Sequence, residues 1–284
     1  MNVPPRIANR LEFSVEESCF PLREERKNYM PDDLRFKRAT FRALHKQGCF
    51  VLPNPWDVGG IRRLEKLGFK ALASTSAGAA WAIGRNDGEL SLDEVLEHLR
   101  QLCAATHLPV NADFEAGFAD EPEGVATNVA LALDTGIAGV SIEDRTGHAL
   151  YERQLAVDRI KAAHEAIARS GHDIVLVGRS EGHLIGQTEL AATIDRLVAY
   201  ADAGADCLYA PGITDLSAIR TLVSAVAPKP VNVLLIGPDI RVADLADAGV
   251  RRVSVGGSLA AAAWAAFDRA VRLLIDEGTL PKRG

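Results

Sequence analysis

Three acidic residues in the middle of the chain have a spacing that suits a metal site. Asp113 and Glu115 stand two positions apart in PVNADFEAG, and Glu143 ends the next apolar run, AGVSIE. Residues two apart on a strand point to the same face, so the first two carboxylates are expected to lie together. Converging carboxylates repel one another unless a cation lies between them, and oxygen ligands without nearby His or Cys favour Mg²⁺, or Mn²⁺, over zinc. The alternative is that each acid caps the helix that follows its strand.

A basic residue ends a later apolar run. Arg179 closes DIVLVGR, and its planar guanidinium suits a bidentate hydrogen bond to a substrate carboxylate. The alternative is an ion pair with a barrel carboxylate such as Glu143, and the two roles are compatible. The turn Ser-Thr-Ser-Ala-Gly at 74–78 offers hydroxyl and backbone N–H groups to a second anionic end of the substrate.

Two histidines are candidate general acids. His148 lies in the loop EDRTGHALYERQ, and His183 follows Arg179 by four residues. Either could protonate a carbanionic intermediate. The alternatives are a histidine in a mobile loop for His148 and a surface residue that opens the next helix for His183.

The elements that must position these residues repeat along the chain. From residue 38, short runs rich in Val, Ile, Leu and Ala recur roughly every 25–40 residues, each followed by a stretch with helical spacing. Eight runs are predicted strands: 49–53, 70–74, 109–114, 138–143, 173–179, 206–209, 230–235 and 252–256.

The segments between these strands predict helices, and several end in glycine. Gly136, Gly171, Gly204 and Gly249 can each take the left-handed conformation that closes a helix. Eight strands joined by helical crossovers predict an α/β fold, a (β/α)₈ TIM-type barrel with its active site at the carboxyl ends of the strands. A doubly wound dinucleotide-binding sheet would show GxGxxG after its first strand, and PNPWD stands there instead.

Bulk properties exclude several classes of protein. The 284 residues and 48% hydrophobic content suit one large domain, and the net charge of −6 comes without a basic stretch for nucleic acid or a membrane surface. No apolar run approaches the ~20 residues of a membrane helix. Four widely spaced cysteines without a CxxC pair, and an N-terminus without a signal-peptide core, predict a cytoplasmic protein with reduced thiols.

Two regions are predicted along the chain. Residues 1–37 are polar and carry four prolines, so we expect an N-terminal extension with one short helix. This extension is interpreted as a partly ordered tail, with an arm that packs on a neighbouring subunit as the alternative. Residues 38–284 are the predicted barrel domain.

Several stretches, taken together, resemble the isocitrate lyase/phosphoenolpyruvate mutase superfamily over about residues 40–275. PNPWDVGGIRRLEKLGFKALASTSAG resembles the family's opening, in which the turn after the second strand cradles the substrate carboxylate. VNADFEAGF resembles its DxDxG metal motif, with Glu115 in place of the usual second Asp. SIED and VGRSE resemble the motifs that supply a further acid to the metal site and a substrate-binding arginine.

The resemblance implies roles for individual residues. Asp113 would be the main carboxylate on Mg²⁺, and Asp87, Glu115 and Glu143 would act largely through metal-bound waters. The substrate, a small anionic carboxylate, would be held by residues Ser74, Thr75, Ser76, Arg179 and Asn232. The resemblance also implies that the C-terminal helix, 258–275, is swapped onto a neighbouring subunit, usually in a homotetramer that is a dimer of helix-swapped dimers.

One loop departs from the family's pattern. Members that cleave isocitrate or methylisocitrate carry a KRCGH-like loop whose Cys protonates the departing enolate carbon. The corresponding loop here, EDRTGHALYERQ, is shorter and has no Cys, although Gly147 and His148 match the end of that motif. Cleavage of isocitrate or methylisocitrate is therefore disfavoured.

The resemblance and this departure together predict a Mg²⁺-dependent carbon–carbon lyase that acts on a small 2-oxo acid or related dicarboxylate through an enolate. Decarboxylation of oxaloacetate ranks first, because CO₂ leaves without an enzymatic base. The candidate catalytic residues are Arg179, His148 and Glu143. One alternative is C–P chemistry on phosphonopyruvate-like substrates, disfavoured because the loop offers few basic residues beyond Arg145 and Arg153. Another is a barrel that binds a carboxylate without catalysis.

Overall fold

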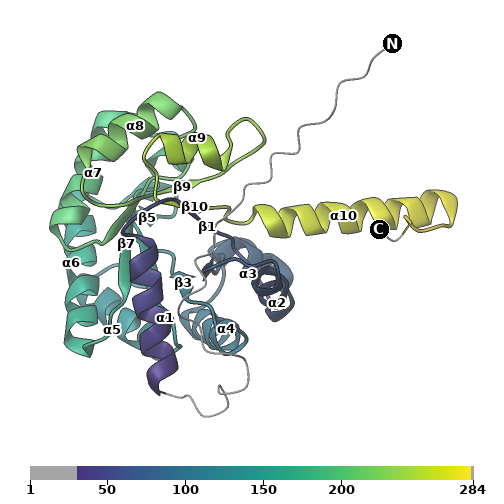
Figure 1. Ribbon diagram of the computed structural model, residues 1–284, viewed down its shortest axis with the longest axis horizontal. Coiled ribbons are helices and arrows are strands. Elements are labelled where there is room, and N and C mark those ends of the chain that lie inside the picture. Colours follow the sequence, from purple (N-terminus) through teal and green to yellow (C-terminus); the bar gives the residue numbers. More distant parts are fainter. Residues whose placement is uncertain (1–30, 283–284) are drawn as a thin grey trace.

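Eight parallel strands surrounded by helices make up the computed structural model, which describes residues 31–282 (Figure 1). The strands follow one another around the sheet in the order β1-β10-β9-β8-β7-β4-β3-β2. The strands are β1 (Phe50–Leu52), β2 (Leu72–Ala73), β3 (Val110–Asp113), β4 (Gly139–Glu143), β7 (Val175–Arg179), β8 (Cys207–Tyr209), β9 (Val231–Leu234) and β10 (Arg252–Ser254). Each lies within a predicted run, so the predicted strands are confirmed.

The sheet is nearly closed into a barrel. A backbone hydrogen bond from Ala73 N to Pro53 O (3.0 Å) bridges the remaining seam between β2 and the end of β1. The predicted (β/α)₈ fold is therefore confirmed. In the described part of the chain, no helix is both long and apolar enough to span a membrane.

Helices alternate with the strands, and most of them cover the outside of the barrel. They are α1 (Pro31–Leu44), α2 (Val58–Lys66), α3 (Ser76–Ala82), α4 (Leu92–Ala104), α5 (Pro122–Leu133), α6 (Arg153–Ser170), η2 (Gly182–Ile185), α7 (Leu190–Asp202), α8 (Leu216–Ala225), α9 (Val242–Asp247) and α10 (Ser258–Glu277). A short hairpin of β5 (Arg145–Thr146) and β6 (Ala149–Leu150) follows β4. Gly171 ends α6 in the left-handed conformation (φ 67°), as predicted.

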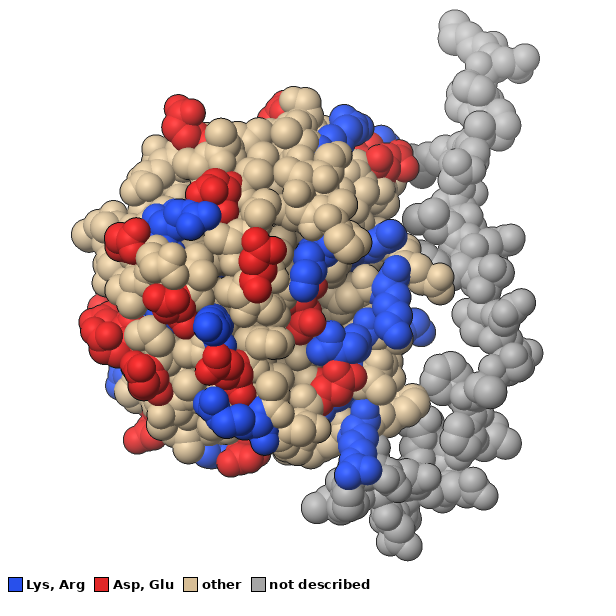
Figure 2. All heavy atoms as spheres, turned by 90° about the vertical axis from the view of Figure 1, so that its left-hand side faces the viewer, with Lys and Arg blue, Asp and Glu red and all other residues tan. Residues whose placement is uncertain are grey.

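The outer surface carries charges of both signs. Figure 2 shows one side of the molecule, where acidic and basic side chains are both spread among uncharged residues. Arg153 and Asp195 form one such exposed pair (2.5 Å), which joins the start of α6 to α7. Exposed pairs of this kind add little to stability.

Helix α1 closes the amino-terminal end of the barrel. Phe41 is fully buried against Val175 and Val177 from the barrel interior, and Arg38 donates to the carbonyl oxygens of Leu133 and Ile137 (both 3.1 Å). Residues 1–30 of the predicted extension lie outside the described residues, and 31–37 begin α1, which runs across the predicted boundary at residue 38.

A buried histidine at the end of α1 predicts a pH-dependent stability. His45 packs edge to face between Phe41 and Phe50 (ring centroids 4.7 and 5.0 Å). Burial, together with the positive charge of Arg252, lowers the pKa of His45 from 6.5 to about 3. The unfolded chain therefore takes up this proton more readily than the folded one. The stabilising contribution is present above pH 6.5 and is lost as the pH falls toward 3.

We expect His45→Gln to weaken this acid dependence, because glutamine stays neutral. The full loss in the native protein is on the order of 5 kcal/mol. The measurement is urea unfolding of both proteins between pH 7 and pH 4.5. Replacing the exposed His107 with glutamine is the control and should leave the native slope unchanged. Parallel pH curves for the His45 variant and the native protein would refute the prediction.

Helix α10 extends away from the barrel (Figure 1). Only Ala260 of this helix is buried, although the helix is rich in large apolar side chains. The exposed ones are Leu259, Trp264, Phe267, Val271, Leu274 and Ile275. The helix lies where the sequence predicted it, and its exchange between subunits remains a prediction.

Candidate active site

Three neighbouring strands bring the charged residues together. Asp113 ends β3, Glu143 ends β4 and Arg179 ends β7, and Glu143 stands directly opposite Arg179 in the strand register. Arg179 Nη1 lies 3.0 Å from Asp113 Oδ1 and 3.4 Å from Glu143 Oε2. All three side chains are about one-sixth exposed, so water screens their charges only partly.

A third carboxylate completes the surroundings of Arg179. Glu181 Oε1 accepts a hydrogen bond from Arg179 Nε (2.5 Å), and the Glu181 side chain is only 2% exposed. These three acids raise the pKa of Arg179 against the opposing effect of its burial. Within residues 31–282, no acceptor is assigned to the remaining nitrogen, Nη2. The guanidinium is thus fixed on two nitrogens and has a third for a ligand.

The predicted Ser-Thr-Ser turn supports the acid on β3. Ser76 donates both its backbone N–H (3.0 Å) and its hydroxyl (3.1 Å) to Asp113 Oδ2. Ser74 Oγ accepts a hydrogen bond from the Asp113 backbone N–H (2.8 Å). Thr75 caps α3 through Gly78 N (3.2 Å). Ser74 and Thr75 are therefore engaged with the protein, while Ser76 also faces the pocket.

Glu115 has unusual surroundings for a carboxylate. Its backbone lies in the left-handed region (φ 47°), and its Oε1 atom is buried without a hydrogen-bond partner among residues 31–282. Burial and the negative charges of Asp113 and Asp87 raise the pKa of Glu115 to about 7. A buried acceptor without a donor is unfavourable, and a cation with its water shell would satisfy it.

Burial also raises the pKa of Glu143, with a further contribution from the negative charges of Glu181, Asp113 and Glu115, whereas Arg179 acts against it. An all-oxygen donor set of this kind fits a hard cation. Across residues 31–282, no three His, Cys, Asp or Glu side chains converge closely enough to hold an ion among them. The arrangement therefore fits Mg²⁺ bound by one or two carboxylates with waters to the others, and not an all-protein cage.

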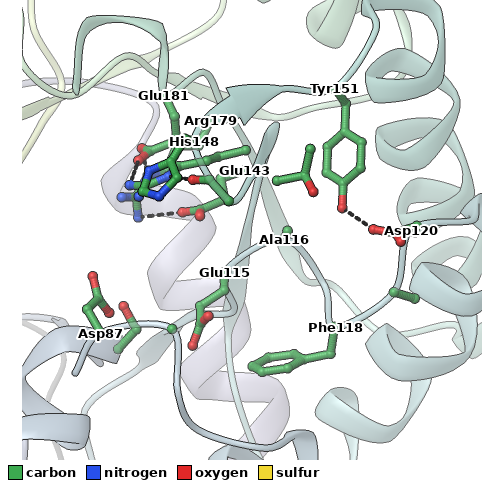
Figure 3. A pocket seen from close by; sticks show the side chains of 16 residues that line it. Asp87, Glu115, Ala116, Phe118, Asp120, Glu143, His148, Tyr151, Arg179 and Glu181 are labelled. Carbon is green, nitrogen blue, oxygen red and sulfur yellow. Dashed lines mark hydrogen bonds and ion pairs between the residues drawn. The ribbon is translucent and has the colours of Figure 1, made fainter. Parts of the chain in front are cut away.

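A pocket of about 550 Å³ opens over these residues (Figure 3). It brings six of the predicted site residues together: Ser76, Asp87, Glu115, Glu143, His148 and Arg179. Asp113 lies next to the pocket and accepts hydrogen bonds from two of its lining residues, Ser76 and Arg179. His148 reaches the pocket from the hairpin between β5 and β6 and is exposed.

Two predicted candidates lie elsewhere. Asn232 is buried inside the barrel, where its amide donates to Ser254 Oγ (2.9 Å) and accepts from Arg252 Nε (3.0 Å), and it is not among the pocket-lining residues. His183 lies in η2 against Gly212, also outside the lining, and its Nε2 is buried with no hydrogen-bond partner in the described part of the chain. The pocket contacts proposed from the resemblance therefore do not extend to Asn232 in this structure.

The sequence placed a second acid beside Glu143 but gave it no role. Asp144 is buried and accepts hydrogen bonds from Ser180 Oγ (2.9 Å), Glu181 N (2.8 Å) and Tyr200 Oη (2.6 Å). This network fixes the end of β4 to the segment after β7. Asp144 therefore positions Glu181, which in turn holds Arg179.

Comparisons with known proteins give a consistent family. The family model for phosphoenolpyruvate phosphomutase matches residues 41–275. An oxaloacetate decarboxylase from Rhodopseudomonas palustris BisB5 is 32% identical over 268 residues, which cover 88% of this chain and 88% of the relative.

Two solved structures share the fold closely. A candidate lyase/mutase from Burkholderia cenocepacia J2315 is 47% identical, with a TM-score of 0.85 over 88% of this chain and 91% of that chain. An oxaloacetate acetylhydrolase bound to its product oxalate is 26% identical, with a TM-score of 0.80 over 88% and 90% of the two chains. The chain therefore belongs to the phosphoenolpyruvate mutase/isocitrate lyase superfamily, as its acidic motifs and Arg179 predicted.

Proposed function

We propose that this chain is a Mg²⁺-dependent lyase that decarboxylates oxaloacetate or a closely related 2-oxo diacid. The observation that carries the proposal is the guanidinium of Arg179, fixed by Asp113, Glu143 and Glu181 with Nη2 left for a ligand. A small carboxylate is the ligand that such a group binds best. The similarity to an oxaloacetate decarboxylase along most of both chains supports this reaction.

The metal would be held by Asp113, with Glu115, Glu143 and Asp87 contacting its waters. Mn²⁺ has the same ligand preferences and could replace it. When bound, Mg²⁺ supplies positive charge that favours electron density on the substrate's carboxylate and 2-oxo oxygens. The buried Oε1 atom of Glu115, for which residues 31–282 offer no hydrogen-bond partner, supports this placement.

The protein's own groups account for the remaining steps. Arg179 orients a substrate carboxylate in the pocket. The bond between C3 and the departing carboxylate breaks, CO₂ leaves, and the electron pair passes to an enolate. His148, which lines the pocket from the hairpin, donates the proton that C3 receives to give pyruvate.

The test is pyruvate release from oxaloacetate by the purified protein, with Mg²⁺ and with EDTA, after subtraction of decarboxylation by the metal alone. Pyruvate that depends on the protein and is abolished by EDTA is the expected result. His148→Gln should lower turnover, whereas His107→Gln on the exposed surface should not. No pyruvate above the metal blank would refute oxaloacetate as substrate.

A second candidate reaction is C–P bond chemistry on phosphonopyruvate-like substrates. The matching family model, described as phosphoenolpyruvate phosphomutase, favours it. The two basic residues that line the pocket, Arg145 and Arg179, both lie within 4 Å of Glu181, which leaves less positive charge for a phosphonate. Incubation with phosphonopyruvate, followed by phosphorus NMR for phosphoenolpyruvate from a mutase or free phosphate from a hydrolase, decides between the two reactions.

The exposed apolar side chains of α10 support an assembly. We propose that α10 packs on a neighbouring subunit in a helix-swapped dimer, two of which form a tetramer. Replacing both Phe267 and Leu274 with Glu should then lower the molar mass measured by light scattering, because two charges would enter an apolar interface. Replacing the already charged Asp268 with Glu is the control. An unchanged mass for the double variant would contradict the proposed contact.

A cytoplasmic location is proposed on the state of the cysteines. Cys49, Cys103 and Cys207 are free thiols, which suits a reducing compartment.

A further inference from the structure

The pocket extends beyond the charged residues that line one side of it. Arg179, Glu143 and Asp87 lie on one side of it, and Tyr151, Asp120 and Phe118 lie on the other, as Figure 3 shows. A four-carbon diacid held at Arg179 and the metal site fills only part of about 550 Å³. The far side is formed by Phe118, Asp120 and Tyr151, and we call it the distal end. It leaves room for a substituent on the substrate.

The wall of the distal end is rigidly held. Arg159 from α6 is only 1% exposed and donates hydrogen bonds to the carbonyl oxygens of Ala116, Ala119 and Asp120. The Arg159 guanidinium also stacks over the Tyr151 ring at 4.0 Å.

A second helix holds the same loop. Asn128 from α5 donates to the carbonyl oxygens of Gly117 (2.9 Å) and Phe118 (3.2 Å). Phe118 has a left-handed backbone (φ 56°), which is uncommon for a residue with a side chain and needs such support. The loop that forms the distal end is thus built into the fold in a defined shape.

The chemistry of the distal end is that of an acceptor. The Tyr151 hydroxyl donates to Asp120 Oδ1 (2.5 Å), and no donor from residues 31–282 is assigned to Oδ2. Arg159 lies behind Asp120 and attracts its charge, but the hydrogen bonds of Arg159 go to main-chain carbonyls and leave the Asp120 carboxylate as an acceptor. The basic residues of the lining, Arg145 and Arg179, are both near Glu181. The carboxylate of Asp120 therefore faces the pocket as a negative acceptor.

We propose that the distal end is a subsite for a substituent on C3 of the substrate that carries a hydrogen-bond donor, with a hydroxyl group as the simplest case. The donor is received by Asp120 Oδ2, and the carbon that bears it packs against Phe118 and Tyr151. A second carboxylate or a phosphonate is repelled by Asp120. The inference rests on the proposed function, because the charged end must hold the acid itself.

The test is calorimetric binding of four 2-hydroxy diacids in the presence of Mg²⁺: malate, 3-ethylmalate, 3-hydroxymethylmalate and isocitrate, which is malate with a carboxymethyl group on C3. The ethyl and hydroxymethyl groups have the same number of heavy atoms, so they differ mainly in the donor. Because Asp120 is exposed to water, we expect a preference of about tenfold for hydroxymethyl over ethyl. Isocitrate should bind more weakly than malate.

Two variants assign these preferences to one residue. Asp120→Asn keeps an acceptor for Tyr151 but removes the charge, so isocitrate should regain affinity relative to malate. Glu121→Gln changes the neighbouring exposed acid, which does not line the pocket, and should keep the native ranking.

The outcomes separate this inference from the proposed function. Malate that binds while the ethyl and hydroxymethyl compounds bind equally would overturn the subsite alone, as would an unchanged ranking in Asp120→Asn. Failure of all four acids to bind would overturn this inference, whereas the proposed function is decided separately by pyruvate release from oxaloacetate.

Discussion

Replacement of Asp113 with asparagine is expected to lower kcat for oxaloacetate decarboxylation by about 10³-fold, the scale seen when a group that stabilises developing charge is removed. Asparagine has nearly the same shape and can still accept from Ser76, so the turn after β2 should keep its place. What is lost is the negative charge that faces both Arg179 and the proposed metal. The chemical step should therefore fail while the barrel stays folded.

Two measurements distinguish this expectation from a loss of structure. The melting temperature of Asp113→Asn should stay within a few degrees of the native value, and Mn²⁺ binding measured by electron paramagnetic resonance should weaken markedly. Asp93→Asn, an exposed acid on α4, is the matched control and should change neither quantity. Native turnover in Asp113→Asn would refute the metal site. Carboxylate binding that needs no metal would instead favour a barrel that binds its ligand without catalysis.

The carboxyl ends of the strands could be predicted from the sequence because parallel strands in a barrel all end on one side. Asp113, Glu143 and Arg179 each follow an apolar run directly, so identifying the runs was enough to place them on one rim. Their contact at 3.0 and 3.4 Å follows from the adjacency of β3, β4 and β7. For these residues, predicting the strands of the fold was enough to predict their place in the site.

Depth within the barrel could not be predicted in the same way. Asn232 is the second residue of β9, two positions before its end, and faces an interior network with Arg252 and Ser254. The sequence marks a polar residue on a strand but not whether it faces the mouth or the interior layer. Thr75 is a similar case, because a hydroxyl that caps a helix and one that binds a ligand occur in the same kind of turn.

The roles of residues that act through long-range contacts could not be predicted either. Asp144 reaches Tyr200 on α7, and Asp120 reaches Tyr151 beyond the hairpin. Each pair depends on how helices pack outside the barrel, which alternation of strands and helices does not determine. The motif SIED did signal an acid pair, and a second acid next to a site residue is a reason to look for a positioning role.

Replacement of Arg179 with lysine is expected to lower kcat/KM by about 10²-fold or more, because a point charge cannot reproduce a planar fork. In the native protein Nε holds Glu181, Nη1 lies between Asp113 and Glu143, and Nη2 has no assigned acceptor within residues 31–282. Lysine keeps the positive charge among these acids. It has one nitrogen, whereas arginine uses two for the acids and has a third for the substrate. The loss should therefore fall on substrate binding, as a higher KM, more than on stability.

The alternative, in which Arg179 serves only as an ion-pair partner, predicts the opposite pattern. Lysine would lower stability under either reading, since three largely buried acids would share one ammonium, but under this alternative KM would stay near its native value. Steady-state kinetics and thermal unfolding of the same samples separate the two patterns. Arg153→Lys, in an exposed pair with Asp195, is the control for a change of arginine to lysine and should alter neither. A raised KM identifies Arg179 as the group that meets the substrate, and a lowered melting temperature at native KM assigns Arg179 to the fold alone.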